Sequence, residues 1–112
     1  PANAYSVPYT VGLVGLIYNT TMVEEAPDSW SAMWDERYAD NILTFNNPRD
    51  AFAIAQFLLG SDINSTDKAT WEAAAEKLKE QNKVLQGRVM DEVFNKMEAG
   101  NAILGNSKMV VR

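Results

Sequence analysis

Two polar residues in the stretch FNNPRDAFAIAQFLLG (residues 45–60) have the types and spacing to hold a ligand. Asn47 offers an amide oxygen that accepts hydrogen bonds, and Asp50 offers a carboxylate that attracts a cation. The same residues also suit a helix start, with Asn47 at the N-cap and Pro48 at the first helical position. Because one side chain can cap a helix and line a cleft, the two interpretations are compatible.

The composition excludes several kinds of chemistry. The chain has 112 residues with no Cys and no His, which excludes disulfides, thiol nucleophiles, Cys/His zinc sites and imidazole acid–base catalysis. No nucleophile–base pair is visible in the sequence either, so we expect no enzyme, no cofactor and no metal site. The formal net charge of -5 does not favour nucleic acid as a partner, because proteins that bind nucleic acid usually carry a basic face.

The elements that must position these residues alternate between strands and helices, which predicts an α/β fold with a mostly parallel central sheet flanked by helices on both faces. The expected strands cover residues 5–19, in two pieces bent near Gly12, then 42–45, 84–89 and 101–105. The expected helices cover residues 28–38, 48–59, 66–82 and 90–100. We expect one domain over residues 1–112, in which residues 106–112 extend a strand or form a disordered or non-native tail.

Apolar spacing marks the side of each expected helix that packs in the core. Residues 51–59 are apolar except Gln56, so their helix is expected to have little solvent-exposed surface. The other expected core faces are Trp30, Met33 and Trp34; Trp71, Ala74, Ala75 and Leu78; and Met90, Val93, Phe94 and Met97.

The turn that contains Asn47 and Asp50 follows the expected strand 42–45. In open α/β sheets, ligands bind in the crevice beyond the carboxyl ends of the parallel strands. The sequence therefore predicts that these two side chains border such a crevice.

No apolar run in the sequence approaches the ~18–20 residues of a membrane span. No charged segment followed by an apolar one opens the chain, so no secretory signal is expected within it. The start PANAYSVPY is expected to be a cut within a loop.

Several pieces of the sequence, in order, resemble the second lobe of bacterial spermidine/putrescine-binding proteins, the solute receptors of ABC importers. These pieces are SVPYTVGLVGLIYN, DSWSAMWDERYADNILTFNNPRDAFAIAQFLLG, the NSTD helix start and MEAGNAILG. The resemblance covers nearly the whole chain, and the order and spacing of the pieces carry it.

The resemblance implies one lobe of a type II periplasmic-binding-protein fold, with a polyamine held in the cleft between two lobes. Asp50 would then form an ion pair with an ammonium group, and Asn47 would accept a hydrogen bond from it. Family members often carry aromatic residues at the position of Val11 and close to that of Lys108. These two positions are therefore implied to border the cleft, where the charge of Lys108 would repel a polyamine.

The resemblance also implies partners and a location. The partners are a polyamine, the first lobe of the receptor and an ABC permease, and the parent receptor would lie in the periplasm or be anchored outside the membrane. Hinge strands around residues 9–13 and 109–111 would have lost their neighbours in this chain. Exposed strand edges template pairing, so a homodimer through these strands is expected.

Two other functions stay open. Asn47, Arg49, Arg88 and Lys108 would suit a receptor lobe for an anion, because N–H groups and cations attract negative charge. The chain could instead be an excised or engineered structural domain that self-associates without a ligand.

Overall fold

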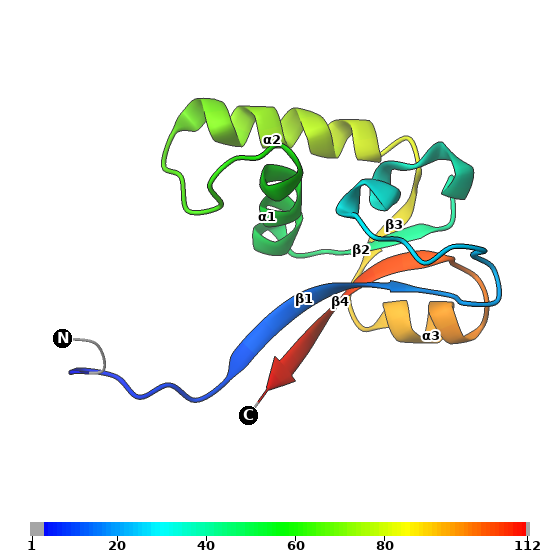
Figure 1. Cartoon of the computed structure of the whole chain (residues 1–112), viewed down its shortest axis with the longest axis horizontal. Coiled ribbons are helices and arrows are strands. Elements are labelled where there is room, and N and C mark those ends of the chain that lie inside the picture. Colours follow the sequence, from blue (N-terminus) through cyan, green and yellow to red (C-terminus); the bar gives the residue numbers. More distant parts are fainter. Residues whose placement is uncertain (1–3, 112) are drawn as a thin grey trace.

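The computed structural model describes residues 4–111, with the backbone alone for residues 108–111, and it contains one four-stranded sheet with helices on both faces (Figure 1). The strands are β1 (Val11–Tyr18), β2 (Ile42–Phe45), β3 (Leu85–Val89) and β4 (Leu104–Val111). The helices are the 3-10 helices η1 (Trp30–Trp34) and η2 (Glu36–Tyr38) and the α-helices α1 (Pro48–Leu58), α2 (Lys68–Gln81) and α3 (Glu92–Glu98). The predicted α/β architecture is confirmed.

The strands lie in the order β1-β4-β2-β3. β2 pairs in parallel with both β3 and β4, whereas β1 is antiparallel to β4. The ladder described between β2 and β4 ends at Leu43 and Gly105, after which β4 continues along β1. Residues 106–111 thus extend β4, and the β1–β4 ribbon (residues 11–18 and 104–111) reaches beyond the other strands in Figure 1.

The core is divided between the two faces of the sheet. One cluster contains Ile42, Met33, Val84 and Leu104, and the other contains Leu43, Phe45, Val93 and Ala102. Because successive side chains of a strand point to opposite faces, neighbouring β2 residues enter different clusters. A third cluster of Ala55, Ala74 and Leu78 joins α1 to α2.

The single helix predicted over residues 28–38 is wrong, because the structure has two short 3-10 helices there. Asp35 separates them with an extended backbone (φ -77°, ψ 123°), and its side chain accepts the N–H of Arg37. A short acidic side chain that bonds to the local backbone competes with a continuous helix. The predicted core role of this segment is confirmed, since Met33 is fully buried.

The strand predicted before Val11 is also wrong. Residues 5–10 form no strand, and Tyr5, Val7 and Tyr9 are exposed. Pro8 lacks the N–H that a ladder requires, which explains why the strand begins after it. Gly12 lies inside β1 opposite Val110 rather than at a bend between two pieces.

Three helices expose apolar residues that were predicted to be in the core. Phe57 on α1 is 66% exposed, so this helix has a solvent-facing side. Trp71 on α2 is 40% exposed and packs its ring against Phe52, with 5.4 Å between ring centroids. Phe94 is exposed on α3, which begins at Glu92, and Met90 is exposed just before that helix.

Within residues 4–111 no helix is long and apolar enough to cross a membrane.

Candidate ligand-binding site

A cavity of about 180 Å³ lies where β2 and β3 end and α1 begins. It is lined by Phe45, Asn46, Asn47, Pro48, Ala51, Phe52, Leu78 and Arg88. β2 and β3 are parallel, so their carboxyl ends meet at this edge of the sheet. This is the edge at which open α/β sheets bind ligands.

Asn47 is the predicted N-cap of α1 and also lines the cavity. Its Oδ1 accepts the N–H of Arg49 at 3.0 Å, and Pro48 occupies the first turn. The cap satisfies one of the N–H groups that a helix start leaves without a partner. Asn47 is half-buried, so capping and exposure to a ligand coexist at this residue.

Asp50 lies in the first turn of α1 and is half-buried. A carboxylate there suits the positive end of the helix dipole. Asp50 is not among the described residues that line the cavity, so the structure does not place it with Asn47 in that hollow.

Arg88 reaches the cavity because of a shift in strand register. Ile42 lies opposite Leu85, but Leu43 lies opposite Gly87, so Gln86 is skipped. A shift of one residue moves the following side chains to the other face of a sheet. Arg88 consequently lies beside Thr44, on the side of the sheet that α2 covers.

The guanidinium of Arg88 is held by two neutral oxygens. Its Nη1 donates to Thr44 Oγ1 at 3.2 Å, and its Nη2 donates to Asn82 Oδ1 at 3.1 Å. Burial lowers the pKa of Arg88 from its ordinary value, because removal from water disfavours the charged form. The arrangement holds a cation at the cavity wall in a fixed orientation.

The remaining predicted site residues lie elsewhere or cannot be placed. Val11 is 61% exposed at the outer end of β1. The backbone of Lys108 lies opposite Val14, and its side chain is outside the described part of the chain. Arg49 is exposed beside the cavity turn. Of the residues considered for an anion, Asn47 and Arg88 share the cavity.

The sequence did not single out the rings of Phe45 and Phe52 as cavity residues, although both line the cavity. Their position next to the polar turn was the available signal: one ends β2 and the other follows Asn47 by about one and a half helical turns. Apolar walls beside a few polar groups are typical of small-molecule sites.

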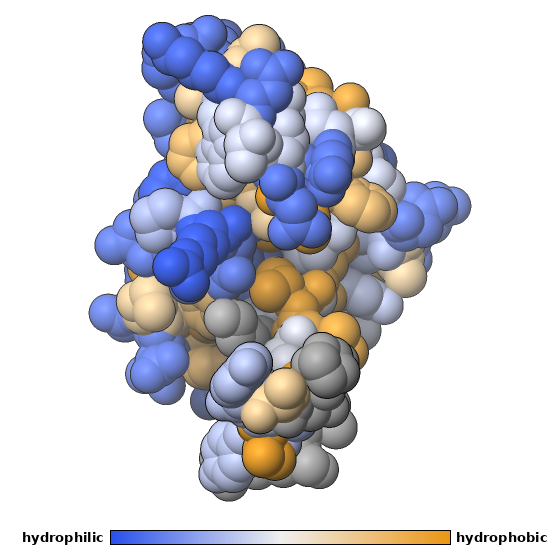
Figure 2. Space-filling view, turned by 90° about the vertical axis from the view of Figure 1, so that its left-hand side faces the viewer, coloured by the Kyte–Doolittle hydropathy of each residue, from blue (hydrophilic) through white to orange (hydrophobic). Residues whose placement is uncertain are grey.

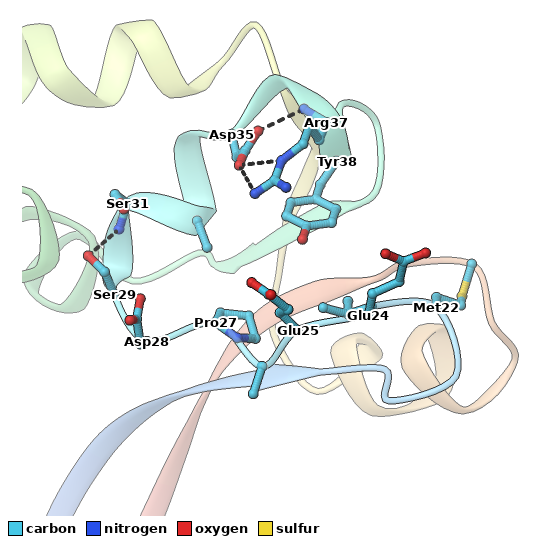
Figure 3. Close-up of a pocket in the computed structure, with 13 residues that line it drawn as sticks. Met22, Glu24, Glu25, Pro27, Asp28, Ser29, Ser31, Asp35, Arg37 and Tyr38 are labelled. Atoms are coloured by element: carbon cyan, nitrogen blue, oxygen red, sulfur yellow. Dashed lines mark hydrogen bonds and ion pairs between the residues drawn. The ribbon is translucent and has the colours of Figure 1, made fainter.

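A larger hollow of about 610 Å³ lies along residues 22–38 (Figure 3). Among its lining residues are Glu24, Glu25, Asp28 and Asp35. Arg37 donates to Asp35 Oδ2 at 2.8 and 2.9 Å, and this bond holds the pKa of Asp35 below its ordinary value. The hollow is acidic, but it lies away from the ends of the parallel strands, and no group of His, Cys, Asp or Glu within the described residues could hold a metal ion.

The side of the molecule shown in Figure 2 has apolar surface near its middle, between polar regions. Exposed apolar residues of β1 are Val11 and Leu13. The predicted exposure of the segment around residues 9–13 is thus confirmed. The side chains of residues 109–111 lie outside the described part of the structure.

A mostly parallel sheet with a cavity at its strand ends is the architecture of an α/β ligand-binding protein. Residues 1–107 match the family described as bacterial extracellular solute-binding protein, so the chain belongs to that family. Members of this family bind solutes and are not enzymes, which confirms the expectation that the chain performs no chemistry.

Three relatives show how far the similarity reaches. The spermidine/putrescine-binding periplasmic protein of Salmonella typhimurium is 35% identical over 80 residues, which are 70% of this chain and 23% of that protein. The structure of a spermidine/putrescine ABC transporter substrate-binding protein from Streptococcus pneumoniae has a TM-score of 0.87 and 32% identity, over 96% of this chain and 33% of that one. The Tp0655 lipoprotein of Treponema pallidum has a TM-score of 0.82 at 18% identity, over 88% of this chain and 31% of that one, and shows the fold alone.

The chain therefore spans about a quarter of the curated relative and about a third of the solved structures. These relatives are named as periplasmic proteins, transporter substrate-binding proteins or lipoproteins.

Proposed function

We propose that this chain is one lobe of a polyamine receptor that serves an ABC importer. The observation that carries the proposal is the turn from Asn47 to Asp50, which follows β2 at the carboxyl ends of the parallel strands. Relatives named for spermidine and putrescine match the chain at 35% and 32% identity, which supports this ligand class. The receptor would work in the periplasm or be anchored outside the membrane, with a first lobe and a permease as partners.

In this proposal Asp50 pairs with an ammonium group and Asn47 supplies an amide oxygen. The proposal also assigns Val11 and Lys108, which belong to β1 and β4, to the border of a cleft that a second lobe would close over the solute. Closure excludes water and strengthens each charged contact. A lobe alone offers an open half-site, in which an exposed ion pair contributes about 0.2–1 kcal/mol.

The isolated chain should therefore bind spermidine with a dissociation constant no better than roughly millimolar, about -4 kcal/mol. Isothermal titration at two salt concentrations measures this constant, which should rise with salt because exposed charges are screened. Asp50→Asn should weaken binding further. Glu98→Gln removes an equal charge from an exposed position at the end of α3 and should leave binding unchanged. A micromolar constant that Asp50→Asn does not change would contradict the proposed site.

We also propose that two copies of the isolated chain pair along β1. This strand is at an edge of the sheet, and Val11 and Leu13 on it are 61% and 55% exposed. Residues 4–18 contain no charged residue, whereas edges that resist pairing usually carry charges or are covered. The observation favours a self-associating lobe.

Sedimentation equilibrium should show a dimer that dissociates on dilution. Leu13→Lys places a charge on the edge strand and should shift the equilibrium to monomer. Glu72→Lys, on the exposed side of α2, changes charge away from β1 and should leave the dimer intact. A monomeric mass at every concentration up to about millimolar, where an association of about -4 kcal/mol becomes visible, would refute the pairing.

A further inference from the structure

Arg88 is a cation whose described hydrogen-bond partners are both neutral. It lines the cavity at the ends of β2 and β3 and is half-buried, with Thr44 and Asn82 as acceptors. None of the ion pairs in the described part of the chain involves Arg88. A charge removed from water is costly unless an opposite charge compensates it.

The pKa of Arg88 agrees with this geometry. Its pKa is lowered, and burial is the one cause, with no contribution from a nearby carboxylate. Asp35, in contrast, has its pKa lowered chiefly by its bond to Arg37. The positive charge of Arg88 thus lacks the neutralisation that Asp35 gives to Arg37.

The guanidinium of Arg88 keeps hydrogen-bonding capacity. It has five N–H donors in a plane, and Thr44 and Asn82 accept from two of them. A planar fork of this kind matches the two oxygens of a carboxylate. The two protein bonds fix the orientation of the fork before a ligand arrives.

The rest of the cavity suits a short aliphatic chain. Its wall includes Phe45, Pro48 and Phe52, with amides of Asn46 and Asn47 at the turn. No Asp or Glu is among the described residues that line it. An ammonium group would therefore meet Arg88 without a carboxylate to balance the repulsion.

We propose that this cavity binds the carboxylate end of a short aliphatic ligand, and that Arg88 selects the carboxylate over an ammonium group. The inference goes beyond the proposed function and shares with it only the edge of the sheet at which the ligand binds. It concerns Arg88 in the cavity, whereas the polyamine proposal concerns Asp50 in the first turn of α1.

Three four-carbon ligands test this selection on the full 112-residue chain. Putrescine has two ammonium ends, 4-aminobutyrate has one ammonium and one carboxylate, and succinate has two carboxylates. Each is titrated at equal ionic strength while the backbone amide signals of the ¹⁵N-labelled protein are recorded. 4-Aminobutyrate and succinate should each shift the amide signals of Asn46, Asn47 and Phe52. Each should bind there about tenfold more tightly than putrescine.

Arg88→Gln should abolish this preference, and Arg49→Gln should not, since Arg49 carries the same charge at an exposed position in the first turn of α1 and does not line the cavity. Arg88→Lys keeps the charge without the planar fork and should lose most of the carboxylate affinity. If Arg88→Gln does not fold, the Arg88→Lys titration and the shift map of the unaltered chain decide. Equal binding of putrescine at these amides would overturn the inference. Carboxylate binding that survives both Arg88→Gln and Arg88→Lys would overturn it as well.

The outcomes separate this inference from the polyamine proposal. Spermidine binding that depends on Asp50, without carboxylate binding at Arg88, would refute the inference and leave the polyamine site standing. Carboxylate binding that depends on Arg88, without spermidine binding, would support the inference and refute the polyamine site.

Discussion

Leu43→Ala should lower the free energy of unfolding by about 2–5 kcal/mol, because it removes a fully buried side chain from the middle of the sheet. Leu43 packs with Phe45, Val93 and Ala102 beneath α3. The backbone around it is fixed on both sides, since β2 pairs with β3 and β4. The cavity left by the substitution therefore has little freedom to collapse.

Urea unfolding followed by far-ultraviolet circular dichroism measures this loss. Leu59→Ala is the matched control, because the same atoms are removed at a position that is 44% exposed beyond the last turn of α1. It should cost less than about 1 kcal/mol. A single cooperative transition is expected for both variants. Equal losses at the two positions, or a broad transition in the unaltered chain, would contradict the described core.

Asn106→Leu should cost about 1–3 kcal/mol, the cost of leaving a buried donor without an acceptor. Asn106 is 1% exposed, and its Oδ1 accepts the N–H of Phe45 at 2.9 Å. This bond follows directly after the point at which the ladder between β2 and β4 ends. The side chain thus replaces a backbone partner where β4 leaves β2.

Two readouts test the role of Asn106. Urea unfolding gives the loss of stability, for which Asn95→Leu on the exposed side of α3 is the control and should change little. Amide hydrogen exchange at Phe45 should accelerate in Asn106→Leu more than exchange at Leu43, which lies before the end of the ladder. Unchanged exchange at Phe45 would show that the amide has another acceptor.

The parts of the fold that the sequence predicted well depend on local chemistry. The start of α1 followed from Asn47 and Pro48, whose capping geometry is decided within a few residues. The end of α1 followed from Gly60, which has a φ of 72° in the left-handed region that glycine adopts most easily. The short run at 42–45 predicted β2 because three of its four residues are apolar and an Asn flanks it on each side.

The failures come from contacts that a local pattern does not contain. The spacing of Trp30, Met33 and Trp34 fits an α-helix, but it also fits the three-residue turns of the observed 3-10 helix. Asp35 decided between them by bonding to the backbone of Arg37. Likewise, Trp71 lies partly outside the core, where it packs against the half-buried Phe52 and its Nε1 donates to the carbonyl of Ser65.

The candidate site was predictable only in part. Asn47 could be placed because the turn after a parallel strand has a known position in the sheet. The face of the sheet on which Arg88 lies could not be derived from the sequence. Leu85 is half-buried and packs against the Ile42 cluster, and strict alternation from it would send Arg88 to the opposite face. The skipped residue Gln86 reverses that result, and its amide donates to the carbonyls of Asp40 and Asn101, which are far from it in sequence.

The β1–β4 ribbon has a consequence for the order of folding. Its paired residues come from opposite ends of the described chain, with Val11 opposite Val111 and Tyr18 opposite Leu104. Closing so long a loop loses more chain entropy than joining β2 to β3 through α1 and α2. We therefore expect β1 to dock last, onto a sheet whose β4 edge is already formed. During that interval the unpaired β4 edge is open to β1 of another molecule as well as to its own, and a higher protein concentration favours this exchange of strands.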